Sequence, residues 1–168
     1  MDFYLQRLHD ALTSVTQGMT WEQRHRHPEG KWCAAEILEH LYLTYTGTLK
    51  GFEKCLSEGR PLASGATIRD RIRTFVVINL GYLPEGRKAP KNTTPKGVAA
   101  ESVAADIFPK IALMDVAIQR CEEAYGRHTK LLDHPILGPL TGTQWRKFHW
   151  IHGRHHVKQI EALRQREQ

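Results

Sequence analysis

The sequence has few cysteines and no long apolar run, and both absences restrict what the protein is. Cys33, Cys55 and Cys121 are odd in number and widely spaced. This spacing argues against a disulfide framework or a CxxC zinc site and favours a reducing, cytoplasmic location. No segment approaches the roughly 18 consecutive apolar residues of a membrane span. Residues 1–10 also lack the basic-then-apolar order of a signal peptide, so we expect no membrane partner.

Strand-like alternation, internal repeats and low-complexity tracts are equally missing. Hydrophobic residues make up 40% of the chain and charged residues 25%, which is typical of a soluble globular protein. The 168 residues suffice for one domain, 1–168, with a sizeable core. The formal charge of +6 is modest and the basic residues are spread along the chain. A nucleic-acid partner needs basic groups gathered on one face among aromatics, so none is expected.

Four long segments carry apolar residues at helical spacing. They cover residues 2–17, 32–59, 102–125 and 141–168. Pro109 lies inside the third segment and predicts a kink or a restart there. The connection between the second and third segments is long, and within it residues 67–80 have helical spacing with arginines on the outer face. The pattern predicts an all-α four-helix bundle with a long crossover between helices 2 and 3.

The segment 141–168 carries four of the ten histidines. Thr141 and Gln144 match a capping box that begins a helix. On a helical wheel of about 100° per residue, one face holds Trp145, His149, His152, His156, Ile160 and Leu163. Each neutral imidazole brings a donor and an acceptor, and leaving either unpaired in a core costs about 1–3 kcal/mol. Three imidazoles on one stripe therefore favour a bound cation over three separate partners.

His152 and His156 are four residues apart, so their rings project to one point from successive turns. This is the geometry of the two-histidine helical metal motif. A third ligand must come from another helix, and His40 is the best-placed histidine because it lies at the edge of the apolar stripe of segment 32–59. We predict that these three histidines hold a divalent ion, with zinc and nickel as the leading candidates. His149 is the reserve, either replacing His156 or acting as a proton shuttle.

Several features near His40 have two interpretations. Gly47 and Gly51 either allow close helix–helix contact or leave a cavity beside His40. Glu36, one turn before His40, is either a partner of the ligand histidine with a catalytic role or only one half of a helix cap. The Pro-, Gly- and Lys-rich loop 84–97 is long for a compact domain. It is either a lid over the metal pocket or plain surface, and the sequence slightly favours surface.

Two motifs resemble DinB-like proteins. The stretch KWCAAEILEHLYLT around His40 resembles their second helix, and HxxxHxxQI at His152 and His156 resembles their last helix. Residues 134–160 resemble one uncharacterised branch of that superfamily, in which a His-Pro-x-x-Gly-x-Leu-Thr approach precedes an H-x-x-H-x-x-x-H helix. Cys33 departs from the usual Ser or Thr at the helix cap.

The resemblance implies a DinB/YfiT-like four-helix bundle, often a homodimer, with a divalent metal on His40, His152 and His156. Some proteins of this kind are metal-dependent transferases that use a low-molecular-weight thiol, and many have no known activity. The expected partners are therefore a small-molecule substrate, such as a low-molecular-weight thiol, and a second copy of the chain.

Three histidine ligands leave an open coordination position, as in catalytic zinc sites. At that position a bound water reaches a pKa of about 7, or a thiol is held as thiolate. The site therefore predicts a hydrolase or a thiol transferase, in which His149 or Glu36 moves the proton. The alternative is a non-catalytic helical bundle in which the metal is structural or absent.

Overall fold

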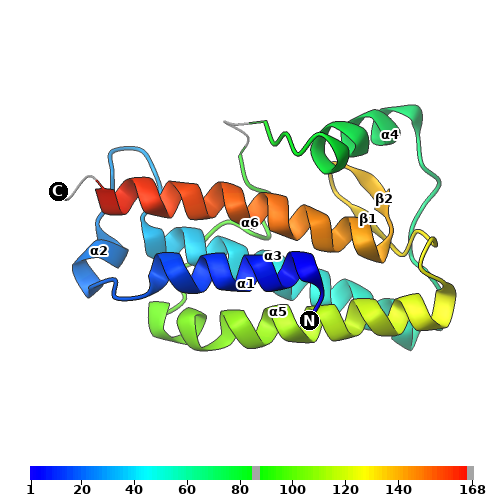
Figure 1. Cartoon of the computed structure of the whole chain (residues 1–168), viewed down its shortest axis with the longest axis horizontal. Helices are drawn as coiled ribbons and strands as arrows, with labels where there is room; N and C mark the ends of the chain where they lie inside the picture. Colours follow the sequence, from blue (N-terminus) through cyan, green and yellow to red (C-terminus); the bar gives the residue numbers. More distant parts are fainter. Residues whose placement is uncertain (85–87, 166–168) are drawn as a thin grey trace.

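The computed structural model describes residues 1–84 and 88–165. Four long helices run side by side, and shorter elements connect them (Figure 1). The long helices are α1 (Phe3–Thr16), α3 (Ala34–Ser57), α5 (Ala100–Tyr125) and α6 (Gly142–Gln165). The short elements are α2 (Trp21–His25), α4 (Ile68–Thr74), the π-helix η1 (Phe75–Asn79) and the strands β1 (Leu132–His134) and β2 (Gly138–Leu140). The predicted helical class is confirmed, with a small hairpin added.

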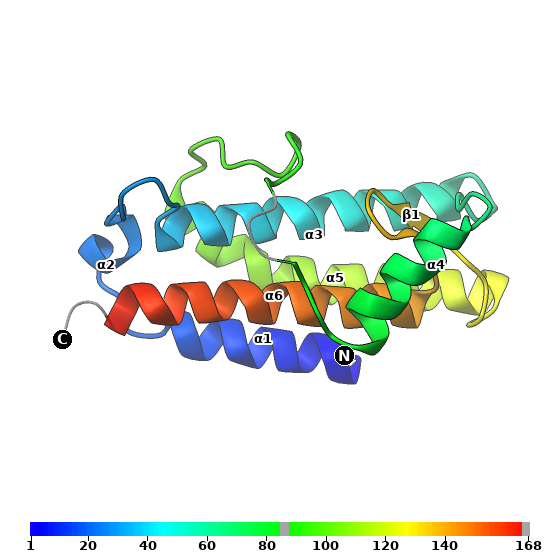
Figure 2. The same ribbon diagram turned by 90° about the horizontal axis from the view of Figure 1, so that it is seen from above.

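The long helices pack mainly as two pairs. α3 lies along α5, α1 lies along α6, and the contacts between the pairs are sparser. Apolar stripes hold each pair together, and their buried members include Leu5, Leu8 and Leu12 of α1 and Ile111, Met114 and Ile118 of α5. Burying each such side chain contributes about 1.5–3 kcal/mol. α4 and the hairpin lie over α3 and α6 at one end of the helices (Figure 2).

A buried ion group joins α5 to α6 and to the start of α1. Arg146 donates from Nε to Asp115 Oδ1 at 2.7 Å and from Nη1 to Glu122 Oε2 at 2.8 Å. The backbone N–H of Asp2 donates to the other oxygen of Asp115 at 2.8 Å. A buried charge without its partner costs several kcal/mol, so this group favours one register of α5 against α6.

The absence of strand-like alternation predicts no strand, and this prediction is wrong just before α6. β1 and β2 pair antiparallel, with Leu132 opposite Leu140. The turn is closed by the backbone N–H groups of Ile136 and Leu137, which donate to His134 Nδ1 at 3.1 and 3.2 Å. Strands of three residues are too short to show a period of two, which is why the sequence gives no sign of them.

The segment 67–80 is helical as predicted from the spacing of Ile68, Ile72, Phe75, Val76 and Leu80, but most of these residues are not the buried ones. Ile68, Ile72, Phe75 and Leu80 are exposed. Val77 and Ile78 are buried instead. The change from α-helix to π-helix at Phe75 shifts the period of the helix, and the side chains that become buried, Val77 and Ile78, lie beyond this change.

Two further elements differ from expectation. α5 continues without interruption through Pro109, so the predicted restart does not occur. The polar connection before α3 contains the short helix α2, which begins with a capping box between Thr20 and Gln23. In the described part of the chain, no helix has the length and hydropathy needed to cross a membrane.

Gly153 of α6 is a point of close contact between helices. A Cβ atom there would overlap Leu8 of α1 and lie 3.3 Å from the hydroxyl of Tyr45 on α3, and both neighbours are fully buried. We predict that Gly153→Ala lowers the free energy of unfolding by about 1–3 kcal/mol, the usual effect of overpacking a core. Denaturant unfolding measures this change.

Gly47→Ala on α3 is the matched control. A Cβ at Gly47 has no neighbour within 4 Å, and alanine has the higher helix propensity. The control is therefore expected to leave stability unchanged or to raise it by up to about 1 kcal/mol. If both variants lose stability equally, the close packing at Gly153 is not the cause.

Candidate metal centre

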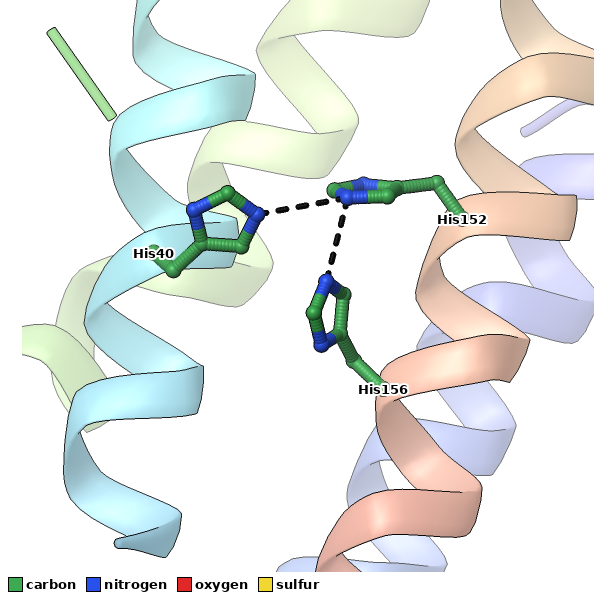
Figure 3. A group of neighbouring side chains, drawn as sticks. All are labelled: His40, His152 and His156. Carbon is green, nitrogen blue, oxygen red and sulfur yellow. Dashed lines mark hydrogen bonds between the residues drawn. The ribbon is translucent and has the colours of Figure 1, made fainter. Parts of the chain in front are cut away.

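His40, His152 and His156 meet at one point between α3 and α6 (Figure 3). His40 comes from α3, while His152 and His156 lie one turn apart on α6. The Nε2 atom of His152 is 3.2 Å from Nε2 of His40 and 3.1 Å from Nε2 of His156. The structure thus brings together the three histidines that the sequence predicts as ligands, and we call them the triad.

The outer nitrogens of two triad members fix which ring nitrogen carries the proton. His40 Nδ1 lies 2.8 Å from the carbonyl oxygen of Thr93, and His156 Nδ1 lies 2.7 Å from Oε1 of Gln159. Both oxygens can only accept, so each Nδ1 must donate a proton. In the neutral rings, Nε2 of His40 and of His156 therefore presents a lone pair to the centre of the triad.

This arrangement leaves the metal-free centre with an unsatisfied contact. Nε2 of His152 can carry one proton and donate it to only one neighbour, so at most one of its two short contacts is a hydrogen bond. In the other contact, the lone pair of the neighbouring ring faces a nitrogen that has no second proton to donate. A divalent cation would accept all three lone pairs. A tetrahedral ion with bonds of about 2.0–2.1 Å holds its nitrogen ligands about 3.3 Å apart. The three nitrogens fit zinc or nickel in type, and the two contacts of His152 fit this spacing.

Burial lowers the pKa of every triad imidazole. Burial and the neighbouring His40 lower the pKa of His156 to about 3, although the bond to Gln159 acts in the opposite direction. Burial and the surrounding histidines hold the pKa of His152 well below its ordinary value. Burial also lowers the pKa of His40, against the bond to Thr93. The rings are therefore neutral at pH 7, which is the form that binds metal ions.

His149 lies in the core and is not part of the triad. It is fully buried, with the ring of Tyr45 at 5.4 Å and a stacked Trp145 at 5.7 Å. Neither ring nitrogen has a hydrogen-bond partner among the described residues. Burial, together with His134, lowers the pKa of His149 to about 3. The structure thus places a neutral imidazole here, one turn before His152 and surrounded by aromatic rings.

Glu36 caps the start of α3. Its Oε2 accepts the backbone N–H of Cys33 at 2.9 Å and lies 3.4 Å from Nδ1 of His27, so of its two interpretations the geometry matches the cap. The ligand atoms of His27, Cys33 and Glu36 also lie within 4.8 Å of one another. His27 is exposed and the carboxylate is already engaged, so this group is a weaker candidate for a metal than the triad.

Two residues that support the triad escape the sequence analysis. Thr93, in the loop before α5, is buried and supplies the carbonyl for His40. Glu39, also buried, accepts the backbone N–H groups of Lys96 and Gly97 at 2.7 and 3.1 Å. Together they fasten this loop to α3. The one sign of Glu39 in the sequence is that it is an acidic residue next to the candidate ligand His40. Nothing in the local sequence points to Thr93.

The triad lies in the wall of a cleft of about 960 Å³ between α3 and α6. The cleft is mostly apolar, and its other walls come from the hairpin, from α4 with η1, and from the loop before α5. Pro84, Lys88, Ala89, Pro90, Asn92 and Thr93 of that loop line the cleft. This part of the loop 84–97 forms one wall of the cleft, whereas residues 85–87 lie outside the described residues.

The two glycines of α3 serve different purposes. Gly47 lines the cleft and a Cβ there would meet nothing within 4 Å, so its missing side chain widens the cleft. A Cβ at Gly51 would overlap the side chain of Leu132 in β1. Gly51 therefore allows close contact, but with the hairpin and not with another helix.

Comparison with known proteins identifies a family without a described function. A family model described as "Protein of unknown function (DUF1569)" matches residues 1–162, which is nearly the whole chain. Searches of curated proteins and of solved structures return no match. The family description names no reaction, so the function has to be inferred from the site.

We predict that the chain binds one divalent ion through the triad. His40→Ala should lower zinc affinity by more than about 100-fold. This is more than the usual effect of removing a residue that only hydrogen-bonds a metal ligand. Helical content should stay nearly unchanged, because His40 lies at the wall of the cleft. Competition with a chromophoric chelator measures the affinity, and circular dichroism measures the helical content.

His155→Ala is the matched control for this prediction. His155 precedes His156 and also lines the cleft, but it does not belong to the triad. The control should bind zinc within a few-fold of the unaltered protein. If His40→Ala retains zinc and His149→Ala loses it, the site lies on α6 alone.

The buried histidines predict that the metal-free protein loses stability in mild acid. An unfolded histidine has a pKa near 6.5, whereas burial holds the pKa of His149 and His156 at about 3. As the pH falls below about 6.5, histidines of the unfolded state bind protons, whereas the buried histidines of the native state do not. The free energy of unfolding therefore falls. Each such histidine should remove about 1.4 kcal/mol between pH 7.5 and pH 5.5.

His149→Leu separates this effect from the triad, because it removes one buried imidazole and keeps all three candidate ligands. Its loss of stability over the same pH interval should be smaller by about 1.4 kcal/mol. Denaturant titrations of both metal-free proteins at the two pH values give the comparison. Equal stability of the unaltered protein at both pH values would be inconsistent with neutral buried imidazoles.

Proposed function

The chain belongs to the DUF1569 family of proteins of unknown function, and we propose that it is a divalent-metal-dependent enzyme with a DinB-like four-helix bundle. One observation carries the proposal. Nε2 atoms of three neutral histidines, two with their tautomer fixed by an outer oxygen, converge in the wall of a large apolar cleft. Catalytic metal sites share this combination of three protein ligands and an accessible fourth position.

The chain's own residues would hold and orient the reactants. The triad binds the ion from one side, and its position in the cleft wall leaves the opposite side facing the substrate. Thr93 and Gln159 keep two of the ligands from rotating. When bound, the ion would supply a lowered pKa to a thiol or water molecule beside it.

The size of the cleft is compatible with thiol transfer. Sites for a single drug-sized ligand span about 300–1,000 Å³, and the cleft of about 960 Å³ lies at the top of that range. It has room for a low-molecular-weight thiol together with the small molecule that accepts it. Hydrolysis requires space for only one organic molecule and remains the second reaction to test.

A purely structural metal is less compatible with this arrangement. A structural site closes its coordination sphere with four protein ligands, whereas the group gathered here contains three histidines beside an open cleft. The homodimer implied by the DinB resemblance stays a prediction, which the elution volume in size-exclusion chromatography tests.

We predict metal-dependent conjugation of a low-molecular-weight thiol to an electrophile. Zinc- and nickel-loaded protein would be assayed with glutathione, cysteine and N-acetylcysteine against 1-chloro-2,4-dinitrobenzene, and in parallel with nitrophenyl esters. The His152→Ala/His156→Ala double variant should lose activity, and His128→Gln, at an exposed residue that does not line the cleft, should keep it. Ester hydrolysis without conjugation would favour the hydrolase. If the fully metal-loaded protein catalyses neither reaction, the structural alternative is favoured.

The same assay tests His149. His149→Leu should keep the metal, and a loss of turnover at unchanged metal content would give His149 the proton-transfer role expected from the sequence. Glu36→Gln is the parallel variant for the second predicted catalytic residue. Unchanged turnover would leave Glu36 with its role in the cap.

A further inference from the structure

His134, at the end of β1, is a fixed hydrogen-bond donor that lines the cleft. Its Nδ1 accepts the backbone N–H groups of Ile136 and Leu137 at 3.1 and 3.2 Å. A nitrogen that accepts cannot carry a proton, so the neutral ring carries its proton on Nε2. Burial lowers the pKa of His134 to about 4, which keeps this ring neutral. In the described part of the chain, the hydrogen bonds of the His134 ring are the two at Nδ1.

The donor lies near the triad along the same cleft. The ring of Phe148 is 4.3 Å from the ring of His134, and it stacks on the ring of His152 at 5.5 Å with an interplanar angle of 9°. One aromatic ring therefore contacts both histidines. A small molecule in the cleft can reach the triad with one end and His134 with the other.

A guanidinium is fastened to the same turn. Arg73 of α4 lines the cleft and donates from Nη1 to the carbonyl oxygen of Ile136 at 3.3 Å. This carbonyl belongs to the residue whose N–H group binds His134. The positive charge of Arg73 and the donor of His134 are thus both held at the hairpin end of the cleft.

The charged side chains that line the cleft are mostly positive. Among the described lining residues, the cations are Lys31, Arg73 and Lys88, and the one carboxylate belongs to Asp133. That carboxylate is engaged, since it accepts the backbone N–H of Ser64 at 3.0 and 3.2 Å. An apolar cleft with an excess of positive charge attracts an organic anion.

From these observations we infer that the hairpin end of the cleft binds the carboxylate of an apolar organic acid, with His134 donating from Nε2 and Arg73 supplying the charge. The apolar body of the acid lies against the cleft walls, and its other end faces the triad. The inference rests on the cleft being the substrate site of the proposed enzyme, and it names the class of substrate. His134 and Arg73 are positioning residues in this arrangement.

The turn allows the binding role of His134 to be separated from its structural role. In His134→Asn, the side-chain oxygen can still accept the N–H groups of residues 136 and 137, because asparagine forms this kind of turn, including before a proline such as Pro135. The variant lacks the Nε2 donor. Arg73→Gln removes the charge. Arg71→Gln and His128→Gln are matched controls, since both residues are exposed and neither lines the cleft.

The experiment compares binding of octanoate with binding of its neutral analogue octanamide at pH 7.5. Tryptophan fluorescence reports binding, because Trp32 and Trp145 line the cleft. The full chain is titrated both metal-free and zinc-loaded. We expect the unaltered protein and both controls to prefer octanoate by at least about tenfold, the effect of one charge-assisted hydrogen bond. His134→Asn and Arg73→Gln should each lose most of this preference and bind octanamide as before.

Equal binding of the two probes, or a preference for octanoate that survives both variants, would overturn the inference. The two proposals fail separately. Zinc binding by the triad without a carboxylate preference removes the substrate class and leaves the proposed enzyme standing. A carboxylate preference in a chain that binds no zinc keeps the anion subsite and removes the metal enzyme.

Discussion

The partnering of buried imidazoles is the constraint on which the centre of this protein depends. α3 packs mainly along α5 and α6 along α1, and the triad is a point where these two helix pairs meet. With Nδ1 protons donated outward to Thr93 and Gln159, lone pairs face inward and repel unless a proton or a cation lies between them. The triad therefore destabilises the metal-free fold locally. A bound ion would remove this repulsion and link the two helix pairs.

The loop before α5 shares this constraint because it is fastened to two adjacent positions of α3. Glu39 binds the loop backbone at Lys96 and Gly97, and His40 binds it at Thr93. Coupling between two equilibria is reciprocal. A metal ion that fixes the ring of His40 would therefore favour the docked state of the loop. The docked loop in turn favours the orientation of the His40 ring that metal binding requires. One wall of the cleft and an ion bound by the triad would thus stabilise each other.

Local periodicity was sufficient to predict the long helices and the triad, because these depend on spacing along one helix and on an apolar edge. It was insufficient for features created by contacts distant in sequence, such as the Thr93 carbonyl or the hairpin at Leu132. His149 shows the limit most clearly. A helical wheel places it on the same face as His152, but the wheel gives direction and not surroundings. Tyr45 closes the core beside His149, whereas Gly47 on the same helix α3 leaves space in the cleft.

The chemistry each histidine offers is decided by the partner of its outer nitrogen. A carbonyl or amide oxygen beside Nδ1, as at His40 and His156, leaves a lone pair on Nε2 and makes a ligand. Backbone N–H groups beside Nδ1, as at His134, leave a proton on Nε2 and make a donor. Burial keeps all of these rings neutral, so the difference between them comes from geometry and not from charge. Histidine thereby offers a lone pair to a cation in one part of the cleft and an N–H group to an anion in another. A site with both groups can orient a substrate that is polar at its two ends.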